Sequence, residues 1–197
     1  MDRKRLTARE MDFESLVAAI ADLHQRFQDK AVKAVNTALT MRNWLIGSYV
    51  QEYEFGGKDR AVYGKHLLTE LAKELAKRKV GNAGRRQLYG YRAFYLAYPQ
   101  IIEAMAAHVV AMMPSRRHGK AGQLRKAPQK RRGAPLSVDP EKLLQSLSYN
   151  HFALLMSIDD EVKRAFYEVQ CIRGQWSVRE LKRQIESFAE RFGREAE

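Results

Sequence analysis

The sequence predicts an all-α fold. Apolar residues recur at spacings of three and four through most of the 197 residues, which is the period of amphipathic helices. Glycine- and proline-containing stretches separate these patterns, and none of them alternates as a half-buried strand does. A hydrophobic share of 45% is enough for a core. We expect a multi-helix domain with a helix-turn-helix-like pair at about 63–98 and a second helical pair at about 159–193.

The N-terminal third contains two helical patterns, at about 13–28 and 31–53, that nothing strong separates. They are two helices or, since no breaker separates them, one long bent helix. The apolar residues at helical spacing in these two patterns are Phe13, Leu16, Ile20, Leu23, Phe27, Val32, Val35, Leu39, Trp44, Ile46 and Tyr49.

The next two helical patterns flank the short turn "KVGNAG" at 79–84. The helix before it, at about 63–78, carries a leucine stripe that we expect to be buried: Leu67, Leu68, Leu71 and Leu75. At 100° per residue, the helix after the turn places one set of side chains on a packing face: Leu88, Tyr91, Tyr95 and Tyr98, with Phe94 at its edge. On the opposite face are Arg86, Tyr89, Gly90 and Ala93, flanked by Arg85 and Arg92. Pro99 ends this helix.

Helical patterning continues on both sides of a basic segment at about 114–138. A fifth helix is predicted at 100–113, and shorter ones at 141–147 and 150–158. In the last pair, Asp159, Asp160 and Glu161 are expected to cap a helix, and Ser177 with Glu180 forms a capping box. The predicted organisation is an N-terminal tail (1–11), a helical domain (12–113), a flexible basic linker (114–138), a C-terminal helical segment (139–193) and a short tail (194–197).

Charge points to a polyanionic partner. The chain has 35 Lys and Arg against 23 Asp and Glu, a net charge of +12. Eight of these cations and no acid lie between Ser115 and Pro135, a segment too polar to offset its own ordering entropy. Lys and Arg release counterions when they contact phosphates, so nucleic acid is the expected partner, with DNA favoured over RNA.

The sequence offers no catalytic or metal constellation. Nucleotide-binding loops and nucleophile elbows are absent, and the five histidines lack ligand spacing. The pair Glu180 and Lys182 has the E-x-K shape of some nucleases, but a capped helix is the wrong setting for it. We expect no cofactor, a core position for the single cysteine Cys171, and a capping or packing role for His151. No apolar run reaches the ~20 residues of a membrane helix and no export signal is evident, so we expect a cytoplasmic protein.

Four stretches resemble the N-terminal domain of the bacterial YhcG family. They are "RNWLIGSYVQEYEFGGKDRAVYGKHLLTELAKELAKR", "RRQLYGYRAFYLAYP", "LSYNHFALLMSIDDEVKRAFYE" and "WSVRELKRQI", in the family's order. The resemblance implies a helical domain that binds DNA and is usually joined to a C-terminal PD-(D/E)XK nuclease-like domain. We expect that second domain to be absent from this chain. Ala83 and Gly84 replace the family's usual aromatic and serine, and Gly90 replaces a frequent arginine.

We therefore expect a non-catalytic, nucleic-acid-binding module, the targeting half of a nuclease-like protein. The alternative is a protein-interaction or oligomerisation module, so a homodimer and a separate nuclease-domain partner both stay open. The pattern gives a weaker prediction for the last helix, where Glu186 and Glu190 share the face of the arginines. The candidate contact residues are Arg85, Arg86, Tyr89, Arg92, Arg116, Arg117, Lys130, Arg131, Arg132, Arg179 and Arg183.

Overall fold

The computed structural model describes residues 12–56, 66–109 and 138–193, and all the regular structure in them is helical. The predicted all-α class is confirmed. The predicted linker, except for Val138, and both predicted tails lie outside the described residues. The helices are α1 (Phe13–Gly56), α3 (Leu67–Lys77), α4 (Arg85–Ala97), α5 (Ile101–Val109), α6 (Pro140–Ser146), α7 (Tyr149–Leu155), α8 (Glu161–Gly174) and α9 (Val178–Gly193).

The chain divides into two compact units, Met1–Asn36 and Thr37–Glu197. In the described residues the first unit is the N-terminal part of α1, and its large apolar side chains are exposed. The two helical patterns of the sequence are thus one continuous helix, as the lack of a breaker between them allowed. No helix in the described ranges is long and apolar enough to cross a membrane.

The core of the second unit is built around aromatic rings from α4 and α7. Phe94 lies 4.7 Å from Phe152 between ring centroids, and Tyr98 lies 4.8 Å from the same ring. Rings at these spacings contribute beyond their buried area. Phe94, expected at the edge of the packing face, is fully buried. The buried residues of this cluster are Trp44, Phe94, Tyr95, Tyr98, Ile101, Met105, Leu143, Leu144, Leu147, Phe152, Leu155, Ile158, Tyr167, Cys171 and Leu181.

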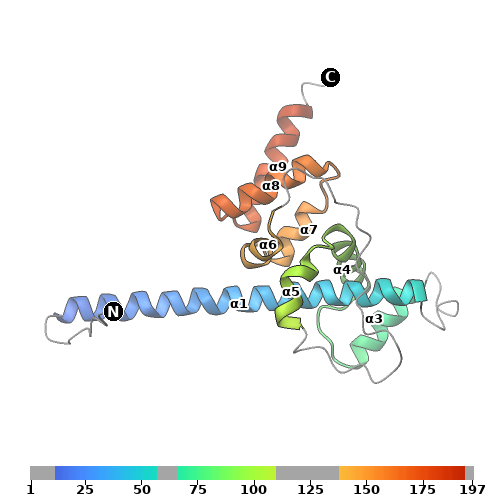
Figure 1. The fold of residues 1–197 in the computed structure, drawn as a ribbon, viewed down its shortest axis with the longest axis horizontal. Coiled ribbons are helices and arrows are strands. Elements are labelled where there is room, and N and C mark those ends of the chain that lie inside the picture. The colour runs from blue at the N-terminus through green and yellow to red at the C-terminus, as the bar shows by residue number, and fades with distance from the viewer. Residues whose placement is uncertain (1–11, 57–65, 110–137, 194–197) are drawn as a thin grey trace. The chain divides into compact units, whose positions relative to one another are not determined.

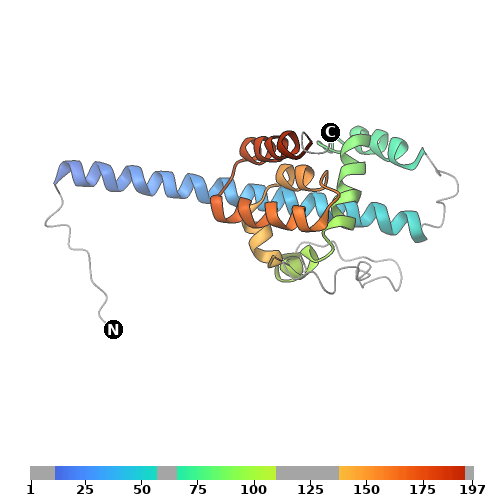
Figure 2. The same ribbon diagram turned by 90° about the horizontal axis from the view of Figure 1, so that it is seen from above.

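Helix α4 crosses the C-terminal part of α1 at very short range (Figure 2). A Cβ atom on Gly47 would lie 2.0 Å from the carbonyl oxygen of Tyr91, so the two backbones touch there. One turn earlier on α1, the indole N–H of Trp44 donates to the Tyr98 carbonyl at 2.9 Å. The Tyr98 hydroxyl in turn donates to the buried Glu168 carboxylate of α8 at 2.8 Å. Buried polar groups need such partners, and these tie α1, α4 and α8 together.

A second, smaller cluster joins α3 to α4. Its buried members are Ala83, Leu88 and Tyr91. The leucine stripe of α3, which we expected to be buried, is only half-buried, and no residue of α3 is fully buried. The expected extent of burial was therefore wrong. In the described structure α4 and the C-terminal part of α1 cover only part of the surface of α3 (Figure 1).

Capping residues begin helices α8 and α9, as the sequence suggested. Asp160 accepts hydrogen bonds from the backbone N–H groups of Val162 and Lys163. Ser177 and Glu180 bond each other's backbone N–H groups, which confirms the capping box. Hydrogen bonds lower the pKa of the Asp160 and Glu180 carboxyls, since each bond favours the charged form.

His151 caps helix α7 from its third position. Its Nδ1 accepts from the Ser148 backbone N–H at 3.1 Å, and its Nε2 lies 3.0 Å from the Trp176 carbonyl oxygen. A carbonyl only accepts, so Nε2 carries the hydrogen and the ring is neutral. Burial lowers the pKa of His151 and outweighs the opposite effect of the Trp176 carbonyl. The predicted capping role is confirmed.

The α1–α4 crossing predicts that Gly47 cannot be replaced. Gly47→Ala should lower the free energy of unfolding by about 2 kcal/mol or more, because the methyl group must separate two backbones. Urea denaturation measures the change. Gly56→Ala on the same helix is the matched control, since its Cβ would meet no atom within 4 Å. Equal effects of the two substitutions would show that the crossing is loose.

Protonation of His151 should destabilise the fold. Its folded pKa lies below the unfolded value of 6.5, so its stabilising contribution is present above that value and is lost as pH falls through the folded pKa. Between about pH 7 and about pH 5, the melting temperature of the wild type should fall more steeply than that of His151→Gln. The carboxyl groups titrate mostly below this window. Parallel curves would contradict the role given to the imidazole.

Candidate functional site

The turn between α3 and α4 places a basic helix start at the surface. After Arg78 the chain adopts left-handed backbone at Lys79 (φ 58°), and the N–H groups of Lys79 and Val80 donate to the Ala76 and Leu75 carbonyls. This is a Schellman ending, and it uses lysine where glycine is usual. Asn82 is also left-handed (φ 53°). Lysine and asparagine, rather than the two glycines of "KVGNAG", therefore take the left-handed positions of this turn.

Two long-range hydrogen bonds hold this turn. The Arg42 guanidinium of α1 donates to the Gly81 carbonyl at 2.8 Å, and the Tyr91 hydroxyl donates to the Asn82 carbonyl at 2.8 Å. Sequence reasoning missed Arg42, because the two partners lie 39 residues apart and share no pattern. These two carbonyls belong to the turn and have no partner in the hydrogen-bond pattern of a helix. The side-chain bonds to them therefore fix the turn and position the first residues of α4.

The first turn of α4 presents two arginines and no acid. Gly84 is the N-cap and provides no side-chain hydrogen bond, and Arg85 and Arg86 follow it with exposed side chains. One turn on, Tyr89 is 64% exposed while its neighbours Leu88 and Tyr91 are buried. The wheel prediction for these residues is confirmed. The free N–H groups, the helix dipole and two guanidinium groups together make this helix end attractive to anions.

Arg92 has partners within the protein. Its Nε lies 2.7 Å from a Glu54 carboxylate oxygen and donates to the Gln51 side-chain oxygen at 2.7 Å. All these atoms are on α1 and α4, and the Arg92 and Glu54 side chains are about two-thirds buried. The sequence placed Arg92 on the flank of the exposed face. The structure directs its guanidinium back to α1 instead, so it is less free for a ligand than Arg85 or Arg86.

The neighbouring cations of α3 are also neutralised. Lys73 pairs with Glu70 at 2.8 Å, and Lys77 pairs with Glu74. The ion pair raises the pKa of Lys77 and lowers that of Glu74. Positive charge without a carboxylate partner is therefore concentrated at the turn and the start of α4 rather than along α3.

The other predicted contact residues fall into two groups. Arg179 and Arg183 are exposed on α9, where Lys182 faces Glu186 at 3.6 Å and Glu180 lies beside Arg183. This face has both signs of charge, as the sequence indicated. The predicted contacts in the basic segment lie outside the described residues: Arg116, Arg117, Lys130, Arg131 and Arg132.

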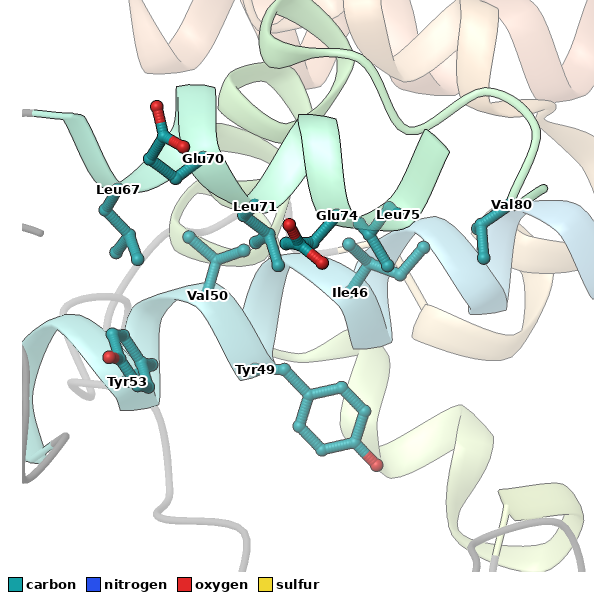
Figure 3. Close-up of a pocket in the computed structure, with 10 residues that line it drawn as sticks. All are labelled: Ile46, Tyr49, Val50, Tyr53, Leu67, Glu70, Leu71, Glu74, Leu75 and Val80. Carbon is teal, nitrogen blue, oxygen red and sulfur yellow. The ribbon is translucent and has the colours of Figure 1, made fainter. Parts of the chain in front are cut away.

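A pocket lies between α3 and the C-terminal part of α1 (Figure 3). Its accessible volume is about 570 Å³, and its lining is mostly leucine, valine, isoleucine and tyrosine side chains. Among the described residues, the charged side chains of the lining are those of Glu70 and Glu74, with no lysine or arginine. The pocket is therefore suited to an apolar group and not to a phosphate. Among the described residues, no cluster of three or more His, Cys, Asp or Glu side chains could hold a metal ion.

Gly90, which the sequence placed on the exposed face of α4, is half-buried and faces Tyr149 of α7. A Cβ atom there would lie 2.7 Å from the Tyr149 hydroxyl oxygen. The Tyr149 ring cannot turn away easily, because it packs against Tyr91 at 5.1 Å and Phe94 at 5.6 Å. Burial raises the pKa of Tyr149 to about 12. An arginine at position 90 would need this tyrosine to move, so the glycine and the tyrosine are a matched pair that sequence reasoning missed.

The sequence of this chain is similar to one protein family and to a protein of Escherichia coli. The family model described as the DUF1016 N-terminal domain matches residues 19–121 and 133–191. A protein of Escherichia coli (strain K12) named "Putative nuclease YhcG" is 29% identical over 186 residues, which cover 88% of this chain and 44% of that protein. The chain thus spans less than half the length of this relative. No solved structure matches it.

The contact between Gly90 and Tyr149 predicts a coupled pair of substitutions. Gly90→Ala alone should destabilise the protein by about 1 kcal/mol, because the new methyl group meets the hydroxyl. In a Tyr149→Phe background the same substitution should stabilise by about 0.5 kcal/mol, since alanine is the better helix former. A double-mutant cycle by urea denaturation measures the coupling. Additive effects would mean that Tyr149 does not restrict position 90.

Proposed function

The chain belongs to the DUF1016 N-terminal domain family, and from this premise we propose that it is a non-catalytic, nucleic-acid-binding module. DNA is the favoured ligand, and α3 with α4 acts as the helix-turn-helix element. The observation that carries the proposal is the start of α4, where exposed Arg85 and Arg86 follow an N-cap that has no side-chain hydrogen bond.

The excess of positive charge around the start of α4 supports a phosphate group as its ligand. Between Arg78 and Arg92 the sequence has five cations and no acid. Four of them are exposed, and Arg92 is the member paired with Glu54. An unpaired guanidinium can contact a phosphate without first breaking an ion pair, and at the edge of a major groove it can also reach a guanine.

The packing of α4 supports the proposal that one side of this helix is held at the surface for a ligand. Its tyrosine face is buried against α1 and α7, and the turn before it is held by Arg42. The opposite side is thereby kept at the surface in one orientation, which limits the entropy lost on binding. Tyr89 stands on that side and can contact a phosphate or stack on an unpaired base.

The relative supports a link to nuclease function, which we propose to lie outside the residues of this chain. The E. coli protein is named a putative nuclease, and this chain aligns with 44% of its length. We propose that the module is the targeting half of such a protein and supplies no catalytic group. As part of this proposal it works in the cytoplasm, on DNA. The basic segment 114–138 would add contacts of low sequence preference.

The alternative is a protein-interaction module without direct contact to nucleic acid. The exposed apolar residues of the N-terminal part of α1 favour this reading. The two functions are compatible, because these residues and the start of α4 lie in different units.

Fluorescence anisotropy with duplex and single-stranded DNA tests the proposal. Arg85→Ala with Arg86→Ala should weaken duplex binding about tenfold at low salt and reduce the slope of log K against log salt by about 2, since two phosphate contacts are lost. The matched control is Lys73→Ala with Lys77→Ala, which removes the same charge from cations that are already paired with glutamates.

The control pair should change binding by less than about threefold. Equal losses in the two double variants would show that only net charge matters, and the assignment to α4 would then be wrong. Absence of binding by the wild type at about 50 mM salt would refute nucleic-acid binding altogether.

A further inference from the structure

The N-terminal part of α1 carries a stripe of large apolar side chains that are exposed to solvent. Phe13, Leu16, Ile20, Leu23 and Phe27 are 45–81% exposed. Scattered apolar residues on a surface need no explanation, but five on one helix face mark an interaction surface. We call these five residues the α1 stripe.

The spacing of the α1 stripe is that of a coiled coil. Successive members are three, four, three and four residues apart, which is the a/d repeat of two heptads. At 100° per residue they lie within about 80° of one another. The ion pair between Asp22 and Arg26, at 2.7 Å, is formed away from this face. Such a narrow apolar seam fits one other helix with the same repeat.

The area of the stripe is sufficient for a specific contact. Its exposed side chains amount to on the order of 600 Å² per helix, close to the roughly 800 Å² per partner of a standard interface. The flanking Val17 is half exposed and can add to this area.

The charges of this helix are divided between its two halves. Asp12, Glu14 and Asp22 are the charged residues from 12 to 23, and all are acidic. From 24 to 36 there are three cations, Arg26, Lys30 and Lys33, against one acid, Asp29. Lys30 occupies the d position that follows Phe27 in the repeat. A parallel partner would place Lys30 against Lys30, whereas an antiparallel partner sets each acidic half beside a basic half and aligns the helix dipoles favourably.

We propose that two copies of this chain dimerise through the α1 stripe as an antiparallel coiled coil. In the register of greatest overlap, Ile20 of one copy faces Leu23 of the other, Leu16 faces Phe27, and Phe13 faces the alkyl stem of Lys30. The Lys30 ammonium then reaches the water at the end of the seam near the acidic half of the partner helix. This inference goes beyond nucleic-acid binding. The dimer would carry two copies of the proposed DNA-binding surface.

Light scattering with size-exclusion chromatography and analytical ultracentrifugation of the full chain tests the dimer. The wild type should be a dimer at micromolar concentration. Ile20→Asp should raise its dissociation constant at least about 30-fold, because a carboxylate would be buried in the seam. Val32→Asp is the matched control. Val32 is 59% exposed and lies on the opposite side of the same helix, so this variant should stay within about threefold of the wild type.

Circular dichroism should show unchanged helix content in both variants, since both positions are exposed in the single chain. A wild type that stays monomeric at ~100 µM, or one that instead binds anionic vesicles through this stripe, would overturn the proposal. Equal weakening by the two variants would also overturn it. DNA binding by a monomeric Ile20→Asp variant would show that the nucleic-acid function stands independently of the dimer.

Cysteine cross-linking tests the orientation. Ile20→Cys and Leu23→Cys chains, one of them tagged, are mixed and oxidised. The antiparallel register predicts that the mixed product exceeds either homodimer, whereas a parallel dimer would give the two homodimers. The native Cys171 is buried and should not react. A majority of homodimeric products would refute the antiparallel arrangement.

Discussion

The close crossing of α1 and α4 at Gly47 is the contact that the Thr37–Glu197 unit depends on. Two helices can approach to backbone contact only where one of them lacks a side chain, and Gly47 meets the Tyr91 carbonyl in this way. Trp44, one turn away, then closes a hydrogen bond to Tyr98 and packs edge-on against Tyr95 at 5.0 Å. With that face of α4 fixed, the rings of α7 pack against it.

This crossing also decides which cations of α4 are available to bind a ligand. Arg92 lies close enough to α1 for Glu54 and Gln51 to bind its guanidinium, so its charge is used within the fold. Arg85 and Arg86 precede the crossing in the chain and are exposed to solvent, as is Tyr89. A partly buried ion pair must be broken before its cation can bind a ligand, whereas an exposed guanidinium needs no such rearrangement. The part of α4 that can contact a ligand is thus its first turn and a half, where Arg85, Arg86 and Tyr89 are exposed.

Two kinds of surface follow from this architecture. One is polar and positively charged, at the start of α4. The other is the α1 stripe, which is apolar and has the heptad spacing of a helix that pairs with another helix. A module with both could bind a polyanion with two copies at once, and the second contact would then be intramolecular and strengthen binding without any new type of contact. For the DNA-binding module proposed above, this would be the physical advantage of the proposed dimer.

By itself, the sequence determined the helical class, the helix ends and the division of α4 into two faces. Those features depend on residues a few positions apart, such as Ser177 with Glu180 or Leu88 with Tyr91. Periodicity reports which side chains share a face, but it cannot report whether that face meets a partner. Only the tertiary structure decided that the α1 stripe is exposed, that the α3 leucines are half-buried, that Arg92 pairs with Glu54, and that Gly90 makes room for Tyr149, because each depends on residues distant in the chain.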